Sequence, residues 1–295
     1  MFIPVSYQKR NQQNSINEMR DVFKEQITEI IDTIIKDKPM FSLSNFSFYY
    51  FDETTLNTNT NEYPINNLYV EINQPKNIKE LSIEKKNNKN KTPELYLTLK
   101  EFKNAIRDLS VARFDNNTLV WEDKYSINFA INIYDHENPE LKTTYYFRVV
   151  PCLTYKNENN SNGVIYYNEN KSLVEIEYPK LSIFNHNIKN KETNGLYSNY
   201  VVMFKNFFMA EKKEKDIPFE FFEILLYNVP NELYIDDSQA NVLKVLNYMR
   251  NLSIKEFKSL DDQSKAFTDP YKSLSIIYAN HALKKLSAFI KKQTN

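Results

Sequence analysis

The first forty positions carry apolar residues at helical spacing. They recur every three or four positions from Ile16 to Ile34, which places them on one face of a helix. Ser15 and Glu18 stand three apart, as in a capping box, so the pattern predicts an amphipathic helix with Ser15 as its cap. The helix is expected to end before Pro39, because the residue before a proline disfavours helical dihedrals.

Strand-like patterns dominate the next part of the chain. Tyr125 to Ile133 alternates polar and apolar residues, as a half-buried strand does. Polar stretches at 52–67 and 74–92 are predicted loops, and Pro93 to Leu109 is predicted to form a helix with Pro93 near its start. The predicted strands are 46–51, 68–72, 117–121, 125–134, 143–150, 163–167 and 173–176.

After Tyr178-Pro179 the pattern becomes helical. Helices are predicted at 197–209, 218–227, 238–252 and from Asp269-Pro270 to about 291. The order of one helix, then strands with a second helix, then helices predicts the α+β class. We expect a sheet lobe at 1–178 and a helical lobe at 179–295.

Glycine, cysteine and histidine exclude several kinds of site. The only glycines are Gly163 and Gly195, so no phosphate-binding loop, dinucleotide fingerprint or nucleophile elbow is present. Cys152 is the only cysteine, which excludes an internal disulfide and a cysteine-rich zinc site. It follows an apolar run, where a cysteine usually behaves as a small hydrophobic residue. The three histidines do not fall at metal-ligand spacing.

The balance of basic and acidic residues limits the kinds of partner that the chain can bind. Lys and Arg number 38, and so do Asp and Glu, so we expect no strong nucleic-acid binding, which needs an excess of positive charge. The basic run from Lys85 to Lys91 is interpreted as a solvated loop. No apolar run approaches the ~20 residues of a membrane span, and the first ten residues lack a signal-peptide core, so a cytoplasmic protein is expected.

Two segments resemble one known family. The first runs from Tyr178-Pro179-Lys180 to the helix bearing Lys205-Asn206, and the second runs from Glu223 to Pro230 and ends in Tyr227-Asn228-Val229-Pro230. With Tyr146-Phe147-Arg148-Val149-Val150-Pro151-Cys152, which looks like the family's third catalytic strand, they are similar to the bacterial cyclic GMP–AMP synthase-like and oligoadenylate synthase-like nucleotidyltransferases. The first segment also contains Asn185, Asn187, Lys189-Asn190-Lys191, Thr193, Gly195, Tyr197 and Val201 to Phe204.

The resemblance implies a polymerase-β-like sheet lobe, a C-terminal helical lobe and a nucleotide cleft. It also implies joining of nucleoside triphosphates with two Mg²⁺ ions. Such ions need a cluster of carboxylates, because hard cations take oxygen ligands. The family supplies two acids one residue apart on one strand, a third on a neighbouring strand, and a Gly-Ser turn for the triphosphate.

This chain departs from the family pattern at each of those places. The Gly-Ser turn corresponds to Phe46-Ser47, and the paired acids to Asn67 and Tyr69, or to Tyr69 and Glu71. The third acid corresponds to Arg148, a cation where Mg²⁺ would bind. Asp52 and Glu53 are the acids that could replace the missing ones, but in a polar loop they are interpreted as solvated charges.

The resemblance and the departures together leave three hypotheses open. The first is a pseudoenzyme without catalytic residues, metal or cofactor, in which Ser47, Arg148 and Lys205 bind a nucleotide. It would have a scaffolding or regulatory role, with an active relative or an effector as partner, in second-messenger or antiviral signalling. The second is an active, Mg²⁺-dependent nucleotidyltransferase with relocated acids. The third is an interaction scaffold without a nucleotide site, its cleft filled by the aromatic residues near 46–51.

Overall fold

The structure, a computed structural model, describes residues 8–38, 41, 45–60, 64–73, 94–135, 138, 140–156, 161–168, 173–212, 220–263, 265–267 and 276–292. The chain forms two compact units. The first comprises Met1–Tyr50 and Ile65–Glu177, and the second Phe51–Pro64 and Tyr178–Asn295. The segment Phe51–Pro64, assigned to the sheet lobe from the sequence, therefore groups with the helical unit. The predicted loop at 74–92 lies outside the described residues.

The first unit contains a seven-stranded mixed sheet. Its strands are β1 (Asn45–Tyr50), β2 (Ile65–Asn73), β3 (Thr118–Glu122), β4 (Ile127–Tyr134), β5 (Lys142–Lys156), β6 (Asn162–Asn168) and β7 (Leu173–Glu177). The main order is β1-β2-β5-β4-β3, with β6 beside β5 and β7 beside β6. Strands β2 and β5 run parallel, and the other pairs are antiparallel. The predicted strands are confirmed, with bounds that differ by a few residues.

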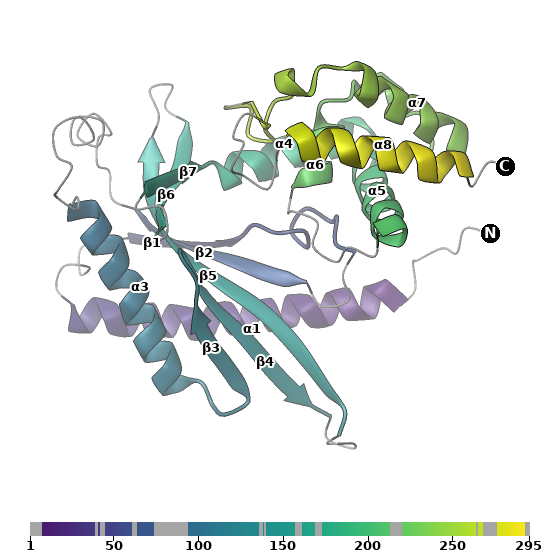
Figure 1. Ribbon diagram of the computed structural model, residues 1–295. Coiled ribbons are helices and arrows are strands. Elements are labelled where there is room, and N and C mark those ends of the chain that lie inside the picture. The colour runs from purple at the N-terminus through teal and green to yellow at the C-terminus, as the bar shows by residue number, and fades with distance from the viewer. Residues whose placement is uncertain are drawn as a thin grey trace. The chain divides into compact units, whose positions relative to one another are not determined.

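Two helices cover one face of this sheet. Helices α1 (Gln8–Asp37) and α3 (Glu94–Arg113) pack against it in the first unit (Figure 1). The ring of Phe23 stacks on that of Phe147 at a centroid distance of 4.1 Å. Leu68, Val70 and Ile72 face the same core, because every second residue of a strand points to the same side. The residues between them point to the opposite side, here called the second face.

The start of α1 corrects one prediction. The helix already includes Gln8, so Ser15 lies inside it and is not its cap. The residues from Gln8 to Asn14 contain no proline or glycine, and Gln, Lys and Arg favour helices, so nothing there stops the helix. The hydroxyl of Ser15 instead forms a 2.7 Å hydrogen bond with that of Tyr145.

The second unit is helical. It contains α4 (Pro179–Glu192), α5 (Leu196–Lys212), α6 (Phe221–Tyr227), α7 (Gln239–Asn251) and α8 (Ile276–Lys292), with short 3₁₀ helices at Asn231–Leu233 and Ile254–Glu256. The α+β prediction is confirmed. Helix α4 was not predicted, because its buried residues include Ser182, His186 and Lys189, which leave little apolar periodicity. The predicted starts of α6 and α8 lie outside the described residues. Among the residues that the structure describes, no helix is long and apolar enough to span a membrane.

Candidate ligand site

The strand register places four side chains in one row across the second face. Trp121 on β3 pairs with Asn128 on β4, Asn128 pairs with Arg148 on β5, and Arg148 pairs with Asn67 on β2. Directly paired residues point to the same side of a sheet. The row therefore joins two positions of the expected acid cluster, Asn67 and Arg148, to an asparagine and a tryptophan that the sequence did not single out.

Arg148 is half-buried and holds one polar contact. Its Nε donates a hydrogen bond to Oδ1 of Asn128 at 3.1 Å. Among the described residues, no carboxylate lies within ion-pair distance of its guanidinium. The outer guanidinium nitrogens can therefore donate to an added oxygen group, and a guanidinium suits carboxylate or phosphate oxygens.

A cavity of about 240 Å³ lies beside this row within the first unit. Asn128 and Arg148 line it, together with the partly exposed rings of Trp121 and Tyr146. Its lining also includes Glu122, whose Oε2 lies 3.0 Å from Nη1 of Arg107 and is thus already paired with a cation. The cavity combines the guanidinium of Arg148 with exposed aromatic surface.

Tyr69, at a position expected for a metal-binding acid, belongs to a different network. Its hydroxyl donates to Oε2 of Glu177 at 2.9 Å, and the hydroxyl of Tyr166 donates to Oε1 of the same carboxylate at 2.6 Å. The ring of Tyr49 stacks on that of Tyr69 at 5.4 Å. Burial, and then the nearby carboxylate of Glu177, raise the pKa of Tyr69 well above its usual range. Tyr69 is therefore a neutral hydrogen-bond donor buried on the second face.

Glu71 and Ser47 lie at the other end of the second face from Arg148. They pair with each other across β1 and β2, and Glu71 pairs with Cys152, four positions along β5 from Arg148. Four residues of a strand span roughly 13 Å. Oε1 of Glu71 accepts a hydrogen bond from Thr154 at 2.8 Å, and Oγ of Ser47 accepts one from Nδ2 of Asn73 at 2.9 Å. The register therefore separates Ser47 and Glu71 from Arg148.

The position matched to the family's Gly-Ser turn, Phe46-Ser47, lies within strand β1. Phe46 and Ser47 are strand residues, because Phe46, Phe48 and Tyr50 alternate toward the core beneath them. The first turn after β1 spans residues 52–57 and begins at Asp52, whose Oδ1 accepts a hydrogen bond from the backbone N–H of Thr55 at 2.8 Å.

Asp52 and Glu53 are not solvated loop charges, which corrects a second interpretation. Asp52 is only 1% exposed. Oε1 of Glu53 lies 2.7 Å from Nζ of Lys205, and Oε1 of Glu223 lies 2.6 Å from the same nitrogen. Loop charges usually face water, and the long-range partners of Glu53 could not be read from its neighbours in the sequence.

Lys205 is a buried residue of the helical unit. Its side chain is 1% exposed, and its ammonium also contacts the backbone carbonyl of Thr58 at 3.3 Å. Burial alone would lower the pKa of Lys205, but Glu223 and Glu53 outweigh it, so the pKa lies above its usual value. Burial raises the pKa of Glu53, and Glu223 adds to this, because two carboxylates share one cation. A phosphate contact by Lys205 stays a prediction, and it would require the ammonium to exchange a carboxylate for the ligand.

The residues at the expected metal positions do not fit Mg²⁺. That ion takes an octahedral shell of oxygen ligands, with carboxylates supplied by the protein. Arg148 presents a cation there, Asn67 is neutral, and Tyr69 is bonded to Glu177. In the described part of the chain, no group of three or more His, Cys, Asp or Glu side chains could hold a metal ion.

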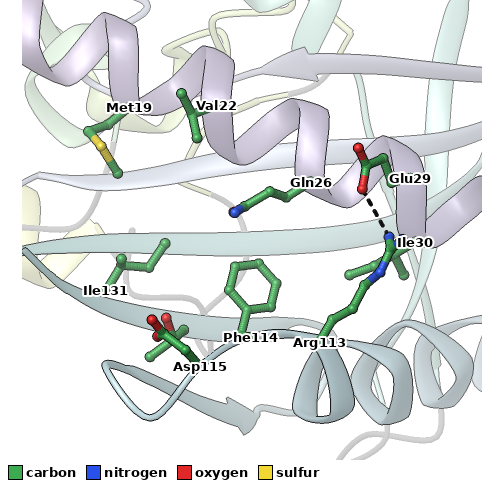
Figure 2. A pocket seen from close by; sticks show the side chains of 10 residues that line it. Met19, Val22, Gln26, Glu29, Ile30, Arg113, Phe114, Asp115 and Ile131 are labelled. Carbon is green, nitrogen blue, oxygen red and sulfur yellow. Dashed lines mark ion pairs between the residues drawn. The ribbon is translucent and has the colours of Figure 1, made fainter.

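A second cavity, of about 360 Å³, lies beside α1 in the same unit. Figure 2 shows the ion pair between Glu29 and Arg113, 3.3 Å apart, at one end of it, and Asp115 toward the other. None of the residues predicted for nucleotide or metal binding lines this cavity. Its lining is Met19, Val22, Gln26, Glu29, Ile30, Arg113, Phe114, Asp115, Thr118 and Ile131.

The cavity beside Arg148 is also lined by Trp121, Asn128 and Tyr146, for which the sequence predicted no ligand-binding role. The alternation of residues 125–134 gave the orientation of Asn128. The register between strands distant in sequence, which brings Trp121 level with Arg148, was not available from any local pattern.

Comparison with solved structures defines the class of fold. The Rhodothermus marinus CdnE c-UMP-AMP synthase, solved with Apcpp and Upnpp, has a TM-score of 0.62 at 18% identity, covering 85% of each chain. The Elizabethkingia meningoseptica CdnE cyclic dinucleotide synthase, solved with GTP and Apcpp, has a TM-score of 0.63 at 16% identity, covering 90% of each. The fold is therefore that of the polymerase-β-like nucleotidyltransferases with a C-terminal helical domain, as predicted.

Sequence comparison finds relatives of the same class. The sequence model of the cGAS/DncV-like nucleotidyltransferase C-terminal helical domain matches residues 184–291. The cyclic UMP-AMP synthase of Rhodothermus marinus is 26% identical over 176 residues, 52% of this chain and 61% of that enzyme. The cyclic nucleotide synthase CdnE01 of Staphylococcus haemolyticus is 31% identical over 117 residues, 34% of this chain and 39% of that enzyme. The matched segments span less than two thirds of either relative's length, and they confirm the resemblance of this chain to the bacterial cGAS/DncV-like nucleotidyltransferases.

Proposed function

We propose that this chain is a catalytically silent member of its family, which binds a nucleotide through Arg148 without a metal ion. The observation that carries the proposal is the position of Arg148. It stands where the family resemblance expects the third metal-binding acid, and no carboxylate of the described residues pairs with it. A fixed guanidinium can neutralise a phosphate directly, which is one task that the metal performs in an active enzyme.

The rest of the second face supports the loss of catalysis. A two-metal mechanism needs several carboxylates within reach of the same ions. Glu71 accepts a hydrogen bond from Thr154, four strand positions from the level of Arg148, and Tyr69 is bonded to Glu177. Restoring an acid cluster would require Tyr69 and Arg148 both to be replaced.

The phosphate contact is assigned to Arg148 rather than to Lys205. Both residues are cations suggested by the sequence, but Lys205 is held by Glu53 and Glu223. Among the described residues, Arg148 bonds only to the neutral Asn128. An anion would therefore meet an uncompensated positive charge at Arg148.

The biological role proposed with this site is regulatory. Relatives include cyclic nucleotide synthases, and an Escherichia coli CdnC with a TM-score of 0.56 at 12% identity was solved in complex with HORMA-deltaN. A silent member could sense a nucleotide of a second-messenger system and pass that state to a protein partner.

A second candidate is an interaction scaffold without a nucleotide site. The cluster of Tyr49, Tyr69, Tyr166 and Glu177 favours it, because these side chains fill part of the second face. The two candidates differ in one property, since only the first requires nucleotide binding that depends on Arg148.

Calorimetric titration with ATP and GTP tests the proposal, first in EDTA and then with Mg²⁺. We expect binding in EDTA that Arg148→Gln abolishes and Arg148→Lys weakens, because a lysine supplies the charge without the planar fork. Arg113→Gln is the matched control, since Arg113 pairs with Glu29 and neither residue lines the cavity beside Arg148. Binding that requires Mg²⁺ would support an active enzyme, and the absence of binding under both conditions would support the scaffold.

A further inference from the structure

We infer that the cavity beside Arg148 takes a nucleoside monophosphate, with the phosphate on Arg148 and the base stacked on the ring of Trp121. The inference rests on the proposed function and adds the class of ligand. It follows from the way the strand register combines one cation with one exposed indole on the same row of the second face.

The spacing of the row suits a ligand with two separated parts. Trp121 and Arg148 stand on β3 and β5, with Asn128 of β4 between them. Neighbouring strands lie about 4.8 Å apart, so the two backbones are roughly 10 Å apart. A phosphate joined to a base through a ribose can contact both side chains, whereas a free phosphate reaches only one.

The aromatic surface is available for stacking. Trp121 is 41% exposed and Tyr146 38% exposed, and both line the cavity. Among the described residues, neither ring stacks on another aromatic side chain, unlike the buried rings of Tyr49 and Tyr69. Stacking on an exposed aromatic ring tolerates every base, because each base has a π-face.

Charge and size favour a single phosphate. Among the described residues of the lining, Arg148 is the only cation, and Asp123 adds a carboxylate that accepts a 2.6 Å hydrogen bond from the backbone N–H of Lys124. A triphosphate carries several negative charges, which nucleotidyltransferases balance with metal ions. The cavity of about 240 Å³ and its one guanidinium match a monophosphate better.

The chain provides its own reporter, because Trp121 is its only tryptophan. The protein is titrated in EDTA with AMP, UMP, ribose 5-phosphate and inorganic phosphate, following tryptophan fluorescence corrected for nucleotide absorption and, in parallel, heat. We expect AMP and UMP to change the fluorescence and to bind about 10- to 100-fold more tightly than ribose 5-phosphate, the range that one stacked base supplies.

Two variants identify the contacts. Trp121→Leu, at an exposed position, should bind AMP no more tightly than ribose 5-phosphate, while Arg148→Gln should lose all four ligands. Leu119→Ala is the control, since Leu119 is 64% exposed on the same strand but does not line the cavity.

The outcomes separate the inference from the proposed function. If AMP and ribose 5-phosphate bind equally, or Trp121→Leu leaves AMP affinity unchanged, the base does not stack there, and the inference is overturned while Arg148-dependent binding stands. If no phosphate compound binds in EDTA, both are overturned. Tighter binding of ATP than of AMP, dependent on Arg148, would overturn the monophosphate class alone.

Discussion

Replacement of Lys205 by methionine should strongly destabilise the helical unit. The ammonium lies 2.6 Å from Oε1 of Glu223 and 2.7 Å from Oε1 of Glu53, and Glu223 is fully buried. Lys205→Met keeps most of the side-chain volume but leaves two carboxylates without their cation. Removing one partner of a buried ion pair costs about 3–5 kcal/mol, because the remaining charge stays buried.

Urea denaturation followed by circular dichroism measures this loss. A cost of that size corresponds to a fall in melting temperature of roughly 10 °C. Lys258→Met is the matched control, because Lys258 pairs with Asp262 at 3.5 Å and its side chain is 67% exposed. Exposed ion pairs of this kind contribute about 0–1 kcal/mol.

The same cluster predicts a rescue and a pH dependence. Lys205→Met combined with Glu223→Gln should recover much of the stability, because one buried charge is gone. The loss in Lys205→Met alone should shrink as the pH falls, since protonation of a carboxylate removes its charge. A stability within about 1 kcal/mol of the wild type at neutral pH would refute the view that Lys205 is a buried structural cation.

Two further predictions concern single side chains. Burial lowers the pKa of His186 to about 4, so the folded protein cannot take up the proton that the unfolded chain accepts. Stability should therefore fall by roughly 3 kcal/mol as the pH drops from about 6.5 to 4, and His186→Gln, but not the exposed His281→Gln, should flatten that part of the profile. Tyr69→Phe removes a 2.9 Å hydrogen bond to Glu177 and should cost about 1 kcal/mol in urea denaturation. Tyr146→Phe, at an exposed position, should cost close to nothing, and equal losses would contradict the assignment of the buried network.

Local patterns predicted the sheet because its strands alternate regularly. The apolar residues Leu68, Val70 and Ile72 indicate which face of β2 packs on the core. The same alternation assigns Asn67 and Tyr69 to the second face. Helix α4 was not predicted, because its sequence lacks a regular apolar pattern. It buries His186 and Lys189, so the residues that face the core are polar, and the pattern that identifies a helix is weak.

The candidate site was only partly predictable. Arg148 was found because one short motif aligns with the family, and its position in β5 is what the structure shows. Its neighbours Trp121 and Asn128 depend on strand pairing, which no local pattern fixes. The partners of Lys205 lie 152 and 18 residues away along the chain, and burial of opposite charges at such separations becomes visible only in the folded structure.

Incubation of the purified chain with labelled ATP, GTP, CTP and UTP, in Mg²⁺ and in Mn²⁺, tests the central claim most directly. The account predicts no cyclic or linear product on chromatography, because Asn67, Tyr69 and Arg148 do not form a metal-binding acid cluster. A metal-dependent product that Lys258→Met retains and Glu71→Gln abolishes would contradict it, and would show that the chain assembles its metal ligands around Glu71.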